Sequence, residues 1–432
     1  MPGPPIYGTW EGRVSLRPWF CKNITQYKKP MKKIVHVSDL HLGARPYNGG
    51  DRMPEQRCFL DWLCQLLEKE KPDALVIAGD LFDVYYPPVG VQEVWFDFLA
   101  RVRSECFAGC VVAIAGNHDS PSALGCTGRV LNLLGIHLVV GDATPQEEAF
   151  RVPCADGGAL VFAAVPFLRE GLLRTQGEGD VCTGFSKHAA EAVAAARVLD
   201  PDAPLVAVAH AVVTGAQILS DTDSERGRHI IGGVETLPSD AFADADYVAL
   251  GHLYTPQTIA GRETARYSGS PIPMSFAEAT SGAGKTLVIA EFDGGRGADV
   301  RVRTVGIPVF RELRAFAGSR ETILKDIASW VPAVQKAGRP WASISVTEGE
   351  GSFAETCEAT RAAIAEKGAE LVVHSDDRRT PARRTDSRPL TVQAVRALNP
   401  VALARDRLSE PDLHLSETEI DTYMKLLQEV LP

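Results

Sequence analysis

The chain has 432 residues, enough for about three domains at ~150 residues each, and a chain of this length can build a full core without disulfide bonds. Its 45% hydrophobic and 23% charged residues are ordinary for a globular protein and argue against a mostly disordered or fibrous one. The 45 Lys and Arg residues against 55 Asp and Glu residues give a net charge of −10, which disfavours a protein that binds nucleic acid through a basic surface.

The cysteine pattern and the lack of long apolar runs indicate a reducing compartment and no membrane span. Nine cysteines are an odd number, none forms a Cys-x-x-Cys pair, and the closest two, Cys106 and Cys110, lack a second pair to complete a zinc site. We therefore expect reduced, mostly buried thiols and a cytoplasmic protein. No apolar run approaches the ~20 residues of a membrane span, so no membrane contact is expected.

Residues 1–30 are predicted to be a leader or an upstream extension. They contain several prolines and polar residues but lack the continuous apolar stretch of a signal peptide. Met31 begins the sequence Met-Lys-Lys-Ile-Val, which is typical of a natural start. We therefore expect the first folded domain to begin at residue 31.

Between residues 31 and 305, short apolar runs alternate with amphipathic stretches. The runs are rich in β-branched residues, as strands covered on both faces are. The expected strands are Ile34–Val37, Ala74–Ala78, Val111–Ala115, Leu160–Val165, Leu205–Ala209, Tyr247–Leu250 and Thr286–Phe292. Helices are expected from Pro54 onward and over about 90–104, 122–134 and 187–199. This alternation predicts a layered α/β fold.

A smaller pattern follows over residues 306–375. Strands are expected at 310–316, 341–347 and 370–373, and helices at 320–330 and 353–367. The resulting β-α-β-α-β unit is predicted to be a small α/β cap domain that follows the domain formed by residues 31–305.

The last two segments are predicted to be a linker and a helical tail. Residues 376–389 hold five arginines and no large apolar side chain, which indicates a solvated linker, with nucleic-acid contact as the alternative. In residues 390–432, Ser416 and Glu419 form a capping-box pattern, and an apolar stripe follows. The stripe fits either packing onto the chain's own core or docking onto a partner protein.

Residues that can bind metal ions follow five of the predicted strands. Ligand sites in α/β sheets lie at the carboxyl ends of strands, so all five sets could converge on one site. Glycines at 79, 116 and 251 allow tight turns there and keep side chains away. Each pattern alone is weak, but five in one order indicate a functional site. They are Ser38-Asp39-Leu-His41, Gly79-Asp80, Gly116-Asn117-His118-Asp119, His210 and Gly251-His252.

These residue types favour a centre with two metal ions. Asp and His offer the mixed oxygen and nitrogen ligands that suit Mn, Fe or Zn. A carboxylate such as Asp80 can bridge two ions, and the side-chain oxygen of Asn117 can bind one without adding charge. Two metal ions ~3.5–4 Å apart can activate a water molecule and stabilise a phosphoryl oxygen during an in-line displacement.

At these positions the chain resembles the calcineurin-like metallophosphoesterase family. The family motifs Asp-x-His, Gly-Asp, Gly-Asn-His-Asp/Glu, His and Gly-His-x-His occur in this order from Asp39 to His252, apart from the last position. The chain is more similar to one branch, the bacterial SbcD-type nuclease subunits, over about residues 31–432. The stretches that support this branch are Phe59-Leu-Asp-Trp-Leu63, Ala78-Gly-Asp-Leu-Phe-Asp83 and Tyr267-Ser-Gly-Ser-Pro-Ile-Pro-Met-Ser-Phe276.

The resemblance implies a layered metallophosphoesterase sandwich with a small α/β cap domain and a C-terminal helical tail, and it implies a role for each site residue. His118 is expected to orient the scissile phosphate and protonate the leaving oxygen without binding metal, and Asp119 to hold His118 in the right tautomer. The implied cofactors are two divalent metal ions, usually Mn in this family. The implied metal ligands are Asp39 and His41 for the first ion, Asp80 as the bridge, and Asn117, His210 and His252 for the second.

Tyr254 departs from the family pattern. It stands where the second histidine of Gly-His-x-His, a ligand of the first metal ion, is expected. A neutral phenol with a pKa near ~10 is a poor ligand for such an ion unless the metal lowers that pKa. Three interpretations stay open: the first ion binds more weakly, Tyr254 binds a harder ion such as ferric iron, or catalysis is reduced or altered.

The resemblance implies a metal-dependent DNA nuclease subunit that acts as an exonuclease on double strands and as an endonuclease on single strands or hairpins, in DNA repair, recombination and replication. Its implied partners are DNA, an SbcC-type ATPase and a second copy of the chain, joined through the nuclease domain. One alternative is a related enzyme for small phosphodiesters, nucleotides or phosphoproteins, and another is a DNA-bridging scaffold with an attenuated site. The segments after residue 308 favour the nuclease, because a minimal phosphatase could end near residue 300.

Overall fold

The computed structural model describes residues 31–46, 50–107, 109–169, 173, 181–217, 237–282, 284–333 and 336–378. The expected leader at 1–30, the expected docking segment at 390–432 and most of the expected linker lie outside the described residues. All described residues up to Ser375 belong to one compact unit, and Asp376–Arg378 belong to another.

The first of two six-stranded sheets carries three of the predicted ligand loops. Its order is β12-β11-β1-β2-β3-β4. From β1 to β4 the strands are parallel, with Ile34 opposite Ala74 and Ala74 opposite Cys110, whereas β11 is antiparallel to both of its neighbours. Parallel neighbours end at the same edge, which places the three loops together. The strands are β1 (Lys32–Val37), β2 (Ala74–Ala78), β3 (Cys110–Ile114), β4 (Ile136–Val139), β11 (Thr286–Phe292) and β12 (Val300–Gly306).

The second six-stranded sheet carries the two remaining ligand loops. Its order is β5-β6-β7-β8-β10-β9, with four parallel strands in the middle and an antiparallel strand at each edge. His210 and Gly251 are paired across the ends of β7 and β8. The strands are β5 (Ala149–Pro153), β6 (Ala159–Val165), β7 (Leu205–His210), β8 (Tyr247–Gly251), β9 (Gln257–Ile259) and β10 (Arg262–Tyr267).

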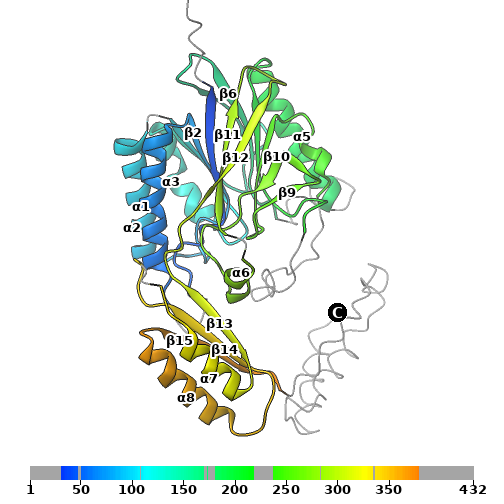
Figure 1. Ribbon diagram of the computed structural model, residues 1–432. Coiled ribbons are helices and arrows are strands. Elements are labelled where there is room, and N and C mark those ends of the chain that lie inside the picture. The colour runs from blue at the N-terminus through cyan, green and yellow to red at the C-terminus, as the bar shows by residue number, and fades with distance from the viewer. Residues whose placement is uncertain are drawn as a thin grey trace, which may run out of the picture. The chain divides into compact units, whose positions relative to one another are not determined.

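The two sheets pack face to face over a shared apolar core, and helices cover their outer faces. The core between the sheets includes Val76 and Val112 from the first sheet and Val206 and Tyr247 from the second. Separate apolar clusters join each sheet to its helices. The result is a four-layer α-β-β-α arrangement (Figure 1), which confirms the predicted layered α/β fold. The outer helices are α1 (Met53–Glu70), α2 (Val89–Arg101) and α3 (Pro121–Leu133) on the first sheet and α5 (Val181–Leu199) on the second.

Helix α1 illustrates how the sequence specifies these helices. Pro54 lies in its first turn, where the missing N–H of proline removes no helical hydrogen bond. Phe59, Leu63 and Leu67 recur on one face and are buried against the first sheet. The helix ends at Lys71, which has a left-handed φ of 48° and donates its N–H to the carbonyl oxygen of Leu67 at 2.8 Å.

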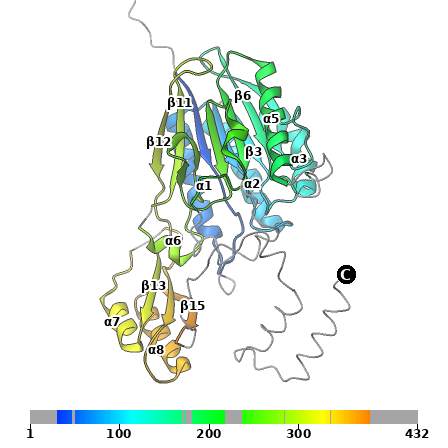
Figure 2. The same ribbon diagram turned by 90° about the vertical axis from the view of Figure 1, so that its right-hand side faces the viewer.

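A three-stranded sheet with two helices follows in the predicted β-α-β-α-β order (Figure 2). Ser319 and Ser352 cap its helices by accepting the N–H groups of Thr322 and Glu355. The division of this segment from residues 31–305 as a cap domain stays a prediction. The elements are β13 (Leu313–Gly318), α7 (Arg320–Ser329), β14 (Trp341–Val346), α8 (Phe353–Glu366) and β15 (Glu370–Asp376), preceded by the short helix α6 (Phe276–Thr280).

Buried charges join the first turn of α1 to the start of this sheet. Arg52 and Arg311 both contact the Glu55 carboxylate, at 2.6 Å and 2.8 Å. Their guanidinium groups lie 5.5 Å and 4.3 Å from the centre of the Trp341 ring. Two cations that share one carboxylate and one aromatic ring form a directional contact, since each needs the same partners in a fixed geometry.

Strands whose residues are not continuously apolar were not predicted from the sequence. In β12, Arg301 and Arg303 are exposed, and β10 begins with Arg262 and Glu263, which are also exposed. Edge strands and strands with one solvated face need no unbroken apolar run, so the pattern that identified the central strands did not apply to them.

Candidate metal centre

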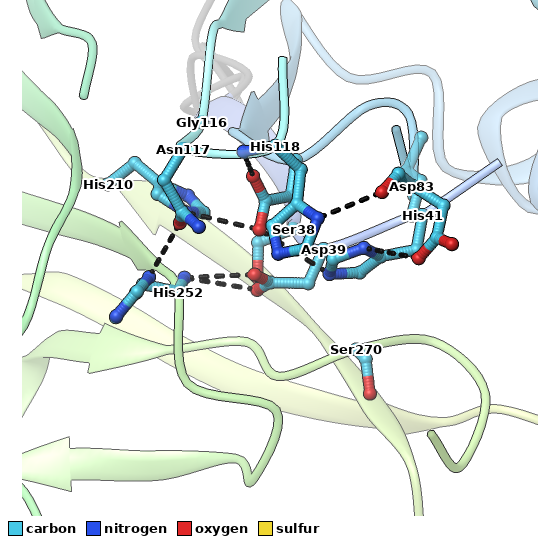
Figure 3. A network of polar contacts seen from close by, with 12 residues as sticks. Ser38, Asp39, His41, Asp83, Gly116, Asn117, His118, His210, His252 and Ser270 are labelled. Carbon is cyan, nitrogen blue, oxygen red and sulfur yellow. Dashed lines mark hydrogen bonds and ion pairs between the residues drawn. The ribbon is translucent and has the colours of Figure 1, made fainter. Parts of the chain in front are cut away.

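Side chains from both sheets meet at the carboxyl ends of β1, β2, β3, β7 and β8 (Figure 3). Two groups there are close enough to hold a metal ion, with the candidate ligand atoms of each group within 4.8 Å of one another. One group is His41, Asp80 and His118, and the other is Asp39, Asp80 and His210. Asp80 belongs to both groups, so the structure places it where a bridging ligand would have to lie.

The Asp80 carboxylate lies between histidines of the two sheets. Its Oδ2 atom is 3.4 Å from Nε2 of His41 and 3.4 Å from Nε2 of His210. Its Oδ1 atom accepts the backbone N–H of His118 at 2.9 Å. The side chain is buried, so water does not compete with the His118 N–H for this carboxylate, and the hydrogen bond fixes its position.

Asn117 brings the two histidines of the second sheet together. Its Oδ1 atom is 3.0 Å from Nε2 of His210 and 2.9 Å from Nδ1 of His252. The other ring nitrogen of His210, Nδ1, is 2.9 Å from the carbonyl oxygen of Ala78. A proton on Nδ1 satisfies that carbonyl and leaves Nε2 as the nitrogen that can bind a metal ion.

The backbone around the predicted ligands is strained. Among the residues that the structure describes, six that are not glycine have a positive φ, and four of these six are predicted metal ligands. Residues held in this region cost about 1–3 kcal/mol each and occur where the surrounding structure fixes them, often at active sites. The four are Asp39 at 55°, His41 at 43°, Asp80 at 50° and His252 at 105°.

Two glycines let the two sheets approach each other beside these ligands, and a third makes room for a ligand of its own sheet. A Cβ atom on Gly79 would lie 2.1 Å from Nδ1 of His210, and one on Gly251 would lie 1.8 Å from the carbonyl oxygen of Ala78. A Cβ on Gly116 would lie 2.1 Å from a carboxylate oxygen of the bridging residue. The prediction that these glycines keep side chains out of the site is confirmed.

His118 and Asp119 differ from their predicted relationship. Nδ1 of His118 is 2.9 Å from the backbone carbonyl oxygen of Asp83. The Asp119 carboxylate instead accepts three backbone N–H groups, from Leu81, Phe82 and Gly116, at 2.8–3.0 Å. The Asp83 carbonyl thus takes the place at Nδ1 that we expected Asp119 to take. Asp119 ties the loops after β2 and β3 to each other because a buried carboxylate needs several donors.

Two residues near the ligands were missed by the sequence analysis. Oδ1 of Asp83 is 3.2 Å from Nδ1 of His41, so Asp83 contacts two site histidines through different atoms. Gln56 of α1 donates its side-chain N–H to the carbonyl oxygen of His41 at 2.5 Å and accepts the N–H of Gly43 at 3.0 Å. Asp83 belongs to the stretch Ala78-Gly-Asp-Leu-Phe-Asp83, which supported the resemblance to SbcD-type subunits. Its contact with His118 goes through a backbone atom, so the side-chain sequence could not predict it.

Tyr254 lies beside the first predicted metal site. Its ring centre is 5.2 Å from that of His41, in an edge-to-face contact, and the side chain is buried. Its carbonyl oxygen accepts the Lys285 ammonium at 2.9 Å, and the same ammonium contacts Ser270 at 2.8 Å and Glu278 at 3.0 Å. This buried network holds the backbone of Tyr254 in place.

Burial and neighbouring charges move the pKa values of the site in different directions. Burial alone would lower the pKa of His210, but the charges of Asp80 and Asp39 and the hydrogen bonds to Asp80 and Ala78 together raise that pKa to about 9. Burial raises the pKa of Asp39 to about 6, and burial together with the charge of His210 lowers the pKa of His252 to about 3. Near pH 7, the His210 proton therefore supplies positive charge between the carboxylates.

The side chains fit divalent metal ions. Both ring nitrogens of His41 are buried and make no hydrogen bond of good geometry in the described part of the chain. Buried carboxylates and unsatisfied imidazole nitrogens at one place are stabilised by a bound cation. Carboxylate oxygen, amide oxygen and imidazole nitrogen together suit first-row divalent ions.

Comparison with known proteins identifies the family to which this chain belongs. The model of the calcineurin-like phosphoesterases matches residues 32–253, which include every predicted metal ligand. The chain therefore belongs to the calcineurin-like phosphoesterase family, whose members use divalent metal ions.

Several curated relatives are more specific, and all three named here are the SbcD component of the SbcCD nuclease. The chain is 31% identical over 332 residues to the protein from Escherichia coli strain K12, covering 74% of this chain and 78% of that protein. It is 36% identical over 266 residues to the protein from Bacillus subtilis strain 168, covering 60% of this chain and 66% of that protein. The protein from Rhodobacter capsulatus is 35% identical over 271 residues, with 59% and 66% covered.

In the described part of this chain, no helix has both the length and the apolar composition needed to cross a membrane.

Metal binding should compete with the proton on His210. Because the pKa of His210 is raised to about 9, we expect Mn²⁺ binding to the metal-free protein to release protons between about pH 7 and pH 8, and the affinity to rise with pH until it levels off above about pH 9. Titration calorimetry in two buffers of different ionisation enthalpy measures the released protons. The His210→Gln variant should bind more weakly and release fewer protons, and a wild-type affinity that does not change with pH would contradict this expectation.

Proposed function

We propose that this chain is a metal-dependent DNA nuclease subunit that acts with an SbcC-type ATPase in DNA repair, recombination and replication, in the cytoplasm. The observation that carries the proposal is the pair of candidate metal groups that share Asp80. The relatives named as SbcD components of SbcCD nucleases support DNA as substrate and the ATPase as partner. They do not favour the alternative of an enzyme for small phosphodiesters.

The proposed reaction is hydrolysis of a phosphodiester bond, as an exonuclease on double strands and as an endonuclease on single strands or hairpins. When bound, two divalent ions, for which we propose Mn, supply Lewis-acid activation of water and of the phosphoryl oxygen. The chain's own part is to hold these ions at a fixed separation through Asp80 and to keep the ligands buried. Asp39 and His41 are the ligands we propose for the first ion, and Asn117, His210 and His252 those for the second. The candidate groups divide differently, since Asp39 groups with His210 and His41 groups with His118.

His118 would contact the scissile phosphate and protonate the leaving oxygen. A proton on Nδ1 satisfies the Asp83 carbonyl, which leaves Nε2 for the substrate. Burial lowers the pKa of His118, although the charge of Asp80 opposes this effect. Nε2 would therefore gain its proton beside a further negative charge, and a bound phosphate provides one. Asp83 acts as the positioning residue that orients the ring.

For Tyr254 we propose the first of the three interpretations, a weaker first metal site. The ring lies against His41 and replaces an imidazole with a phenol whose oxygen is a poor ligand when neutral. The remaining ligands, Asp39, His41 and Asp80, would still hold the ion. If the wild-type protein failed to cleave DNA and Tyr254→His restored cleavage, the interpretation as an attenuated scaffold would be supported instead.

The remaining parts of the chain have proposed roles in assembly. Residues 306–375 would form a cap over the DNA-binding side, residues 376–389 a linker, and residues 390–432 a segment that docks onto the ATPase. We also propose a homodimer through the nuclease domain. A groove of about 400 Å³ lies between α2 and α3 and is lined mainly by apolar side chains. Val130 and Leu134, which line the groove, and Leu133 at the end of α3 are exposed, which favours contact with an apolar surface such as the same face of a second copy.

Replacing His118 should remove nuclease activity while preserving the metal sites. We expect His118→Gln to lower kcat on hairpin and single-stranded DNA by about 100-fold or more, because proton transfer to the leaving oxygen is lost. DNA binding and Mn²⁺ affinity should stay near the wild-type values. Assays of the purified chain with and without the ATPase provide the measurement. If the wild type cleaved neither DNA in either condition, the proposed function would be wrong.

Restoring the family ligand should strengthen the first metal site. We expect Tyr254→His to lower the Mn²⁺ concentration needed for half-maximal cleavage by about 10-fold, which corresponds to about 1.4 kcal/mol of binding free energy. Tyr254→Phe is the matched control and should behave like the wild type if the phenol oxygen is not a ligand. A large loss of metal affinity in the phenylalanine variant would instead assign the oxygen as a ligand.

A charge on the exposed face of α3 should separate the proposed dimer. Leu133 is 87% exposed, so Leu133→Glu leaves the fold intact but places a charge in the apolar contact. We expect a monomeric mass by light scattering, whereas Val198→Glu, at an exposed position of α5, should keep the dimeric mass. A wild-type protein that is monomeric at high concentration would rule out this interface.

A further inference from the structure

The loop between β2 and α2 exposes apolar and aromatic side chains next to the metal centre. Tyr86 is 75% exposed, Val84 is 48% exposed and Val89, the first residue of α2, is 70% exposed. Single exposed apolar residues are common, but several within six positions mark a contact surface. Their exposure in one loop therefore indicates a surface that can contact a ligand.

This loop begins at a residue that already contacts the site. Asp83 reaches His118 through its carbonyl oxygen and His41 through its side chain (Figure 3). Tyr85 and Tyr86 follow two and three residues later. Both tyrosines are therefore only a few residues along the chain from the groups that contact the proposed position of the scissile phosphate.

The second sheet contributes a cation to the same surface. The Arg169 guanidinium lies 5.0 Å from the centre of the Tyr85 ring. Arg169 follows β6, and two residues earlier the N–H of Phe167 bonds to the carbonyl oxygen of Ala115, at the end of the first sheet's β3. The Phe167 ring centre is 6.4 Å from that of His210. Loops from both sheets thus meet at Tyr85 and Arg169 at the rim of the site.

The loop is fixed at both ends. The N–H of Asp83 bonds to the carbonyl oxygen of Leu42 at 3.1 Å, and the Gln92 side chain donates to the carbonyl oxygen of Pro87 at 2.8 Å. Pro87 and Pro88 restrict the backbone between the tyrosines and α2. A rigid loop loses little conformational entropy when a ligand stacks on its rings.

We propose that Tyr85, Tyr86 and Arg169 form a stacking surface for unpaired bases of the DNA strand that enters the metal centre. This inference rests on the proposed nuclease function and names the substrate class that the site prefers. Aromatic rings stack on any exposed base, and an arginine beside them contacts the backbone phosphate. Bases within a duplex are already stacked on each other, so the surface favours single strands, hairpin loops and frayed ends.

Binding measurements without metal ions test the surface independently of cleavage. We expect the full-length chain with Tyr85→Leu and Tyr86→Leu to bind a short fluorescent thymidine oligonucleotide about 10-fold more weakly by anisotropy in EDTA. The matched variant with Tyr85→Phe and Tyr86→Phe keeps both rings and should bind like the wild type. An abasic oligonucleotide of the same length and a blunt duplex should lose no affinity in either variant.

Arg169→Gln separates the phosphate contact from stacking. We expect it to weaken binding of the normal and the abasic oligonucleotide alike, and to reduce the salt dependence of binding by about one phosphate contact.

Three results would overturn the proposal. They are unchanged oligonucleotide binding in the leucine variant, an equal loss on the abasic strand or the duplex, and a change of oligomeric mass that assigns the tyrosines to a contact between copies. Because no cleavage is involved, a failure here differs from a failure of the His118 experiment, which tests the nuclease activity itself.

Discussion

The site depends on how closely the two sheets approach each other at their carboxyl edges. Where the sheets meet, a Cβ atom at Gly79 or Gly251 would overlap an atom of the opposite sheet or its ligand loop. This approach brings His210 and His252 of the second sheet onto the carboxylates Asp39 and Asp80 of the first. A separation greater by the size of one side chain would split the ligands into two half-sites, each with too few donors. The apolar core between the sheets therefore sets the distance on which the metal chemistry depends.

The electrostatics of this site differ from those of the whole chain. The net charge of −10 argues against a basic nucleic-acid-binding surface. Locally, two divalent ions would bring +4 against the carboxylates of Asp39, Asp80 and Asp83, leaving about +1 where a phosphate would lie. Before metal binds, the raised pKa of His210 supplies part of the same positive charge. An acidic protein can thus present a cationic site, which fits a subunit that takes further DNA affinity from its partners.

The sequence predicted the parts of this structure that leave a pattern in side-chain types. Strands buried on both faces, such as β2 and β11, appear as apolar runs, and ligands at their ends could be placed together from the α/β rule. Edge strands such as β12 have polar residues on a solvated face and were missed. The positions of Asp83 and Gln56 could not be predicted, because their contacts go to or from backbone atoms. The partner of His118 Nδ1 was predicted wrongly for the same reason. It is the backbone carbonyl oxygen of Asp83, and a backbone atom leaves no trace in the pattern of side-chain types.

The left-handed backbone of the predicted ligands has a consequence for which ions the site accepts. Asp39, His41, Asp80 and His252 are held at positive φ by hydrogen bonds and close packing, which limits how far their backbones can shift when an ion enters. Selection between cations depends on cavity size and ligand flexibility as well as on ligand type. A site that cannot widen or contract discriminates by ionic radius. We therefore expect a larger ion such as Ca²⁺ to bind less well than the smaller transition-metal ions of the same charge.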